Sequence, residues 1–156
     1  MESGTTGKLL AARAFVTWNR QPPYYTESGW RGTLRQEGGG VLTNQAIHTL
    51  DLMRYFGGEI AAISGQITNQ HLRGVIEVED TACVLLQYES GATGIFYATT
   101  AYRQNAPVLL ELVCEQETLR LEGSNLYRLE GNRFTLLCGE EERMPGKPYW
   151  GSGHAR

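Results

Sequence analysis

The sequence predicts an α+β domain in which one helix packs on a large, mostly antiparallel sheet. Apolar residues follow helical spacing over residues 42–56. From residue 59 onward the pattern changes to an alternation of apolar and polar residues, which is typical of strands. Short turns with glycine separate several of these stretches and favour antiparallel hairpins.

The first predicted strand covers residues 9–18 and ends before Pro22 and Pro23. A long loop up to about Glu37 is expected to follow. Loops of this length in compact domains are often functional or mobile. This one is unusually rich in large side chains, namely Tyr24, Tyr25, Trp30 and Arg31.

The helix predicted over residues 42–56 has one polar face and one apolar face. Ideal helical geometry brings three further polar side chains within roughly 40° of Asn44 around the axis. These are His48, Asp51 and Tyr55. The opposite face is apolar and should pack on the sheet, through Leu42, Ala46, Leu50 and Met53.

Three glycines, residues 38–40, precede this helix. They allow the backbone to approach a ligand or another segment closely. We expect them to lead directly into the helix, whose free N–H groups favour anionic or hydroxylated ligands. An Asn, a His and an Asp on a helix surface are also common as a merely solvated face, so both interpretations stay open. Gly57 and Gly58 should end the helix.

Seven strands are expected after the helix, at residues 60–69, 78–88, 92–100, 108–115, 118–121, 126–129 and 133–137. Residues 89–91 and 130–132 are short turns that should join antiparallel neighbours. The helix would cover one face of such a sheet. The other face must be solvated or covered by a partner, which predicts a homodimer or tetramer formed through the sheet.

Composition narrows the class of protein. A chain of 156 residues corresponds to one domain, and its net charge of −3 argues against a nucleic-acid partner. No apolar run is long enough to span a membrane, and the N-terminus lacks signal-peptide features, so a cytoplasmic location is expected. Cys83, Cys114 and Cys138 are widely spaced, which predicts reduced core residues and no metal site.

Several motifs follow one another in a characteristic order. They are Tyr24-Tyr25, Trp30-Arg31-Gly32, glycines 38–40 with Asn44, His48, Asp51 and Leu52, Glu79-Asp80-Thr81-Ala82, Gly91-Ala92 with Gly94, and Trp150-Gly151-Ser152-Gly153-His154. In this order and spacing the chain resembles, over nearly its whole length, the C-terminal domain of the Gfo/Idh/MocA family. This is the glucose-fructose oxidoreductase and inositol dehydrogenase group of NAD(P)-dependent oxidoreductases.

The resemblance implies a larger parent protein, with an N-terminal Rossmann domain that binds the dinucleotide. Residues 1–156 would be its single C-terminal domain for substrate binding and oligomerisation, an excised fragment without that half. The sequence has no G-x-G-x-x-G motif after an early strand. We therefore expect NAD or NADP in the full-length parent, none on the fragment, and no activity from the fragment alone. The Lys147-Pro148 pair does not match the family's E-K-P lysine.

The resemblance also implies site residues. The family's catalytic histidine falls on His48, and its carboxylate or carboxamide position falls on Asn44, where many members have Asp. An amide cannot take a proton at neutral pH, so Asn44 would position a substrate hydroxyl while His48 acts as base. Asp51 would either orient the His48 ring or brace the loop.

Four more residues are candidates for substrate binding, namely Tyr25, Trp30, Arg31 and Gly40. Trp30 would offer an aromatic face to a sugar ring, or would instead pack under the glycine turn. Arg31 would bind hydroxyls or a phosphate. We expect Glu79 and Asp80 to bond to backbone or to pair with arginine.

The leading hypothesis is the substrate-binding half of a dehydrogenase for a sugar, polyol or sugar derivative. The alternative is a regulatory module of the same fold that binds a sugar or nucleotide sugar without turnover. His48 favours the enzyme, whereas Asn44 in place of Asp favours the sensor. A scaffold that uses its sheet only for assembly is a third interpretation, which the aromatic loop and the helix face disfavour.

Overall fold

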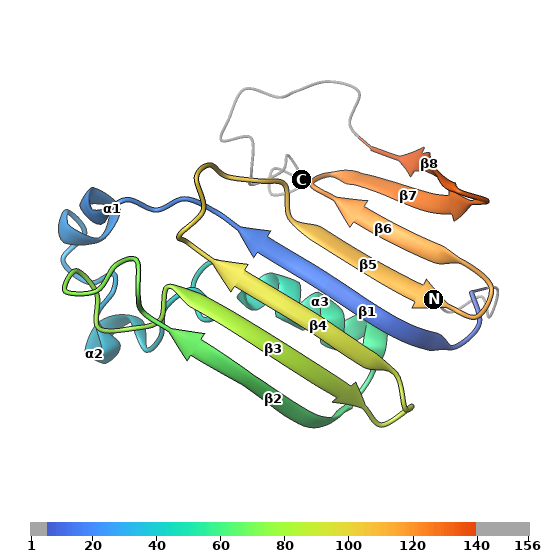
Figure 1. Ribbon diagram of the computed structural model, residues 1–156, viewed down its shortest axis with the longest axis horizontal. Helices are drawn as coiled ribbons and strands as arrows, with labels where there is room; N and C mark the ends of the chain where they lie inside the picture. Colours follow the sequence, from blue (N-terminus) through green and yellow to red (C-terminus); the bar gives the residue numbers. More distant parts are fainter. Residues whose placement is uncertain (1–5, 140–156) are drawn as a thin grey trace.

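Eight strands form one continuous sheet in the computed structural model, which describes residues 6–139 (Figure 1). The strands are β1 (Leu9–Thr17), β2 (Ile60–Thr68), β3 (Thr81–Tyr88), β4 (Thr93–Thr99), β5 (Leu109–Cys114), β6 (Thr118–Glu122), β7 (Asn125–Glu130) and β8 (Arg133–Cys138). Lys147 and the motif at residues 150–154 lie outside the described residues. All seven strands expected after the helix are present, so the α+β prediction is confirmed.

The order of strands across the sheet is β2-β3-β4-β1-β5-β6-β7-β8. Every neighbouring pair is antiparallel except β1 and β4, which run parallel. The predicted hairpins β3–β4 and β7–β8 are both present. Gly91 and Gly131 in their turns have positive φ angles of 87° and 60°, a conformation that glycine adopts without strain.

Three helices lie between β1 and β2, namely α1 (Pro22–Thr26), α2 (Leu34–Glu37) and α3 (Ile47–Gly57). The first two are single turns inside the segment expected to be a loop. A proline in the first turn explains α1, because its fixed φ suits a helix start and its missing N–H costs nothing there. No described helix is of a length and hydropathy suited to crossing a membrane.

The start of α3 differs from the prediction. The helix begins at Ile47 rather than at residue 42, and residues 41–46 form turns. These residues close turns instead, in which the Asn44 N–H donates to the Gly40 carbonyl oxygen and the Ala46 N–H to the Val41 carbonyl oxygen, and Glu79 binds the N–H groups of Gly40, Val41 and Leu42. Asn44 therefore precedes the helix instead of lying on its polar face.

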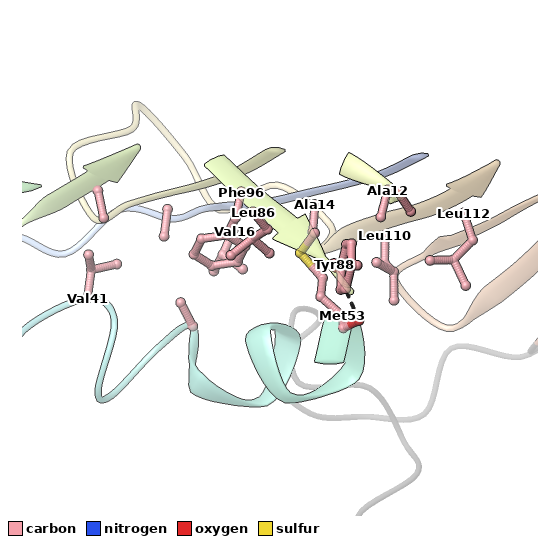
Figure 2. Close-up of a cluster of buried hydrophobic side chains, with 14 of the residues drawn as sticks. Ala12, Ala14, Val16, Val41, Met53, Leu86, Tyr88, Phe96, Leu110 and Leu112 are labelled. Carbon is pink, nitrogen blue, oxygen red and sulfur yellow. Dashed lines mark hydrogen bonds between the residues drawn. The ribbon is translucent and has the colours of Figure 1, made fainter. Parts of the chain in front are cut away.

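The main core fills the space between α3 and the sheet (Figure 2). Met53 is fully buried there with Phe96 of β4 and Val16 of β1. The Tyr88 hydroxyl donates to the Met53 carbonyl oxygen at 3.2 Å. The four residues predicted to face the sheet all contact this core: Ala46 and Met53 are buried, and Leu42 and Leu50 pack against it. Leu42 and Ala46 do so from the turns before α3.

A second, smaller core lies under α1 and α2. Tyr25 packs there with Leu72, Ile76 and Val78, which belong to the segment between β2 and β3. In Figure 1 this segment and both short helices lie together at the end of the sheet where β1, β2 and β4 terminate. This end of the sheet therefore carries nearly all the residues predicted to form a site.

The sheet face opposite α3 is open in the described residues. Leu85 and Ile95 point to that face because they alternate with the buried Leu86 and Phe96, and they are 56% and 53% exposed. Cys83 is exposed on the same face of β3, and Cys138 is exposed near the end of the edge strand β8. The prediction of a core position is thus wrong for these two thiols and correct only for Cys114.

Candidate functional site

The glycine run is fixed by one carboxylate. Glu79 accepts the Gly40 N–H at 2.9 Å and the Leu42 N–H at 3.0 Å on its two side-chain oxygens. Its carbonyl oxygen accepts the Val41 N–H at 3.0 Å. The expectation that Glu79 bonds to backbone is confirmed, and the segment that the glycines approach is the strand entry at residue 79.

Gly40 is required for this approach. A Cβ atom added to it would lie only 1.9 Å from the Glu79 carbonyl oxygen, so no other residue fits without moving the backbone. The prediction that the glycines open a helix with free N–H groups is wrong, because the Gly40 N–H is already bonded and α3 begins only at Ile47.

Asn44 is held by a residue that the sequence analysis did not single out. Its side-chain amide N–H donates to one oxygen of the Glu37 carboxylate. The other oxygen accepts the backbone N–H of Gly32 at 2.5 Å. Glu37 therefore ties Asn44 to the turn that carries Trp30 and Arg31. Glu37 lies seven positions before Asn44, and no simple spacing pattern relates them; the reversal of the chain at the glycines brings them together.

His48 and Asp51 lie in the first turns of α3 and are both exposed. No hydrogen bond joins their side chains in the described part of the chain. The exposed ring of His48 is open to a ligand approaching the helix surface. His48 follows Asn44 by one helical turn of sequence, across the junction between the turns and the helix.

Arg31 is packed between two aromatic rings. Its guanidinium carbon lies 4.4 Å from the centre of the Tyr24 ring and 4.8 Å from that of Trp30, distances typical of cation–π contacts. Its Nε atom is buried and has no hydrogen-bond partner among the described residues. Trp30 remains 43% exposed, so its ring offers free surface next to a positive charge.

Tyr25 lies beneath this surface. It is 5% exposed, and its hydroxyl donates to the Thr100 hydroxyl oxygen at 3.3 Å. Burial raises the pKa of Tyr25 to about 12, so it stays protonated over the physiological range. This position makes Tyr25 a support for the loop, and the substrate contact predicted for it stays a prediction.

Two further carboxylates brace the same region. Glu77 accepts the backbone N–H of Leu34 at 2.9 Å, and the buried Asp80 accepts those of His71 and Leu72 at 2.8 and 2.9 Å. The prediction that Asp80 bonds to backbone is confirmed. Within residues 6–139, no group of three or more His, Cys, Asp or Glu side chains is arranged to bind a metal ion.

The comparison with known families agrees with this architecture. The model of the GFO/IDH/MocA C-terminal domain matches residues 1–120 of the chain. The chain belongs to this family. The resemblance found from the sequence motifs is thereby confirmed.

Curated relatives of this family member are sugar dehydrogenases. The D-apiose dehydrogenase of Rhizobium rhizogenes is 32% identical over 139 residues, which cover 83% of this chain and 36% of the relative. The levoglucosan dehydrogenase of Pseudarthrobacter phenanthrenivorans is 23% identical over 136 residues, with 72% and 34% covered. The chain thus spans about a third of the length of these curated relatives.

Solved structures share the fold. The WlbA dehydrogenase from Bordetella pertussis, in complex with NADH and UDP-GlcNAcA, has a TM-score of 0.75 and 26% identity. The match covers 90% of this chain and 39% of that one. Levoglucosan dehydrogenase in complex with NADH and levoglucosan has a TM-score of 0.73 at 21% identity, over 86% and 40% of the two chains.

Proposed function

We propose that this domain binds the substrate of an NAD(P)-dependent dehydrogenase acting on a sugar, polyol or sugar derivative. The single observation that carries the proposal is the joint position of His48 and Asn44, where an exposed imidazole follows an amide tied in place by Glu37. The names of the relatives support the class of substrate, since D-apiose and levoglucosan are sugar compounds.

His48 has the chemistry for the proton half of the reaction. Oxidation of a secondary alcohol removes a hydride from carbon and a proton from oxygen. Imidazole titrates close to neutral pH, so His48 can accept the hydroxyl proton. A bound nicotinamide supplies the acceptor for the hydride. Asn44 would hold a neighbouring substrate hydroxyl by a hydrogen bond, and Asp51, one turn further along α3, would bias the position of the His48 ring.

The exposed aromatic surface supplies a second contact. Trp30 would pack against a sugar ring, and the Arg31 guanidinium beside it would bind hydroxyls or an acidic group of the substrate. Gly40 would contribute through the close approach of its backbone, which shapes the turn before Asn44.

The residues of this chain do not fit a dinucleotide. Its glycine run lacks the G-x-G-x-x-G spacing, and the N–H groups of Gly40 and Leu42 are occupied by Glu79. We therefore propose that another domain of a longer protein, of the Rossmann type, binds NAD or NADP and that this domain alone is inactive. The NADH in the related structures favours NAD.

Assembly through the sheet is part of the same proposal. The open face carries Leu85 of β3 and Ile95 of β4 at more than half exposure, near the β2 edge of the sheet. Apolar side chains in such a position favour a partner surface, and a second copy of the protein would form a dimer or tetramer there.

The experiment is a dehydrogenase assay on the full-length protein with NAD⁺ or NADP⁺ and D-apiose, levoglucosan or UDP-GlcNAcA as substrate. Replacing His48 by alanine should lower kcat by about a hundredfold or more, because it removes the base. Affinity for the dinucleotide should stay unchanged, since the substitution leaves the proposed cofactor domain intact.

His71→Ala is the matched control. His71 is also an exposed histidine, whose backbone N–H donates to Asp80, and no hydrogen bond joins its ring to Asn44 or Glu37 within residues 6–139. This variant should retain the wild-type rate. A His48→Ala protein with full activity would refute the role of His48. A wild-type protein that binds these compounds without turnover would instead establish the sensor alternative.

A further inference from the structure

Glu37 occupies a central position that the proposed reaction does not use. It is the common partner of the Asn44 side chain and of the Gly32 backbone, so it links both parts of the proposed substrate site. Glu37 is the last residue of α2, and the glycines that follow reverse the chain toward Asn44.

The chemistry of this contact determines how Asn44 is oriented. A carboxylate oxygen only accepts hydrogen bonds, so the atom of Asn44 that faces Glu37 must be the amide nitrogen. The carbonyl oxygen of the same amide is then the atom left for a substrate. An amide that was free to rotate could offer either its donor or its acceptor, whereas this one offers an acceptor.

We propose that Glu37 is a positioning residue that presents the Asn44 carbonyl oxygen to a substrate hydroxyl. The inference rests on the proposed function and deepens it, because an acceptor at this place selects a group that carries a hydrogen. A second hydroxyl of the substrate, beside the one whose proton His48 accepts, satisfies that acceptor, whereas a carbonyl or ether oxygen at the same place cannot donate to it.

The Gly32 contact extends the role of Glu37. Gly32 directly follows Trp30 and Arg31. The Ile76 side chain occupies the space where a Cβ atom of residue 32 would lie, and Glu37 accepts the Gly32 N–H, so both residues hold this turn in place. The same carboxylate therefore fixes the distance between the Asn44 amide and the aromatic surface. A substrate that contacts both groups would have to match this fixed distance.

The test is a double-mutant cycle in the full-length protein, assayed with NAD⁺ and D-apiose, levoglucosan or UDP-GlcNAcA. The variants are Asn44→Asp, Glu37→Gln and the two together. Asn44→Asp places two carboxylates against each other and should lower kcat/KM by about thirtyfold. The double variant restores a donor and an acceptor with exchanged roles, and should recover at least about tenfold of that loss.

Glu77→Gln is the matched control. Glu77 also braces the loop by accepting a backbone N–H, that of Leu34, but it does not contact Asn44. Its substitution should change kcat/KM by less than about threefold. A loss of kcat/KM as large as that of Glu37→Gln would mean that Glu37 only stabilises the loop, and it would overturn the proposal. So would an Asn44→Asp protein with wild-type activity, or a double variant no better than Asn44→Asp.

Unfolding temperatures of the same proteins separate this inference from the proposed function. A wild type that turns over none of the three compounds would refute the proposed function for them. The contact between Glu37 and Asn44 would still be tested, because the double variant should regain the unfolding temperature that Asn44→Asp loses. Strictly additive losses in unfolding temperature would overturn the inference.

Discussion

Carboxylates stabilise both ends of the sheet, but they bind different partners. At the end that carries the proposed site, Glu37, Glu77, Glu79 and Asp80 all accept backbone N–H groups. Between β1 and β7 two acidic side chains pair with arginines instead. These pairs are Arg13 and Arg120 with Glu111, and Arg128 with Glu117.

The difference teaches how each region is specified. A carboxylate on backbone N–H groups dictates the path of a loop that has no ladder of its own, and it satisfies donors that would otherwise be buried unpaired. An arginine pair on a regular strand adds to a backbone that the sheet already defines. We therefore expect substitutions at the site end to cost more stability than comparable ones near β8.

The largest effect is expected at Gly40. Replacing Gly40 by alanine should lower the free energy of unfolding by about 3 kcal/mol, because the new Cβ would meet the Glu79 carbonyl oxygen at 1.9 Å. Urea unfolding of the full-length protein measures the change. Gly38→Ala is the control: its φ of 81° costs about 1 kcal/mol, but nothing lies within 4 Å of the added atom. Equal costs at the two positions would contradict the close-approach explanation.

A smaller effect should follow from Glu79→Gln. The amide nitrogen of glutamine would face one of the N–H groups of Gly40 and Leu42, so we expect a loss of about 2 kcal/mol. Glu117→Gln, at the other end of the sheet, weakens a pair whose Arg128 is 45% exposed and should cost about 0.5 kcal/mol. Denaturant unfolding at low and high salt tests both, and a larger loss at Glu117 would reverse the comparison.

An effect smaller than that of Glu79→Gln concerns the pH dependence of Glu111. Burial alone would raise its pKa, but hydrogen bonds from Arg13 and Arg120 outweigh this and hold the pKa below its ordinary value of 4.5. A lowered pKa stabilises the fold above the ordinary value, and this contribution is lost as the pH falls through the lowered pKa.

Replacing Glu111 by glutamine should therefore cost about 1 kcal/mol at neutral pH. The difference from wild type should shrink as the solution is acidified toward about pH 3. Unfolding measured across this range tests the sign. A difference that grows in acid would show that the arginines do not determine the titration of Glu111.

Much of this architecture could be predicted from local patterns. Alternation located the strands, and helical spacing correctly directed Met53 toward the sheet. The start of α3 could not be predicted, because residues 41–46 form turns that are joined to Glu79, far along the chain. For the same reason the family motif drew attention to Asn44, while the partner that holds it, Glu37, carries no local signal.

The position of β1 has a consequence for how the protein is made. β1 comes first in sequence among the eight strands of this sheet, yet it lies in the middle of the sheet. Its parallel neighbour pairs Thr93 with Ala11, and its antiparallel neighbour pairs Cys114 with Leu9. An apolar strand must therefore wait, unpaired, until β4 emerges from the ribosome about eighty residues later, and during that interval it needs protection from aggregation.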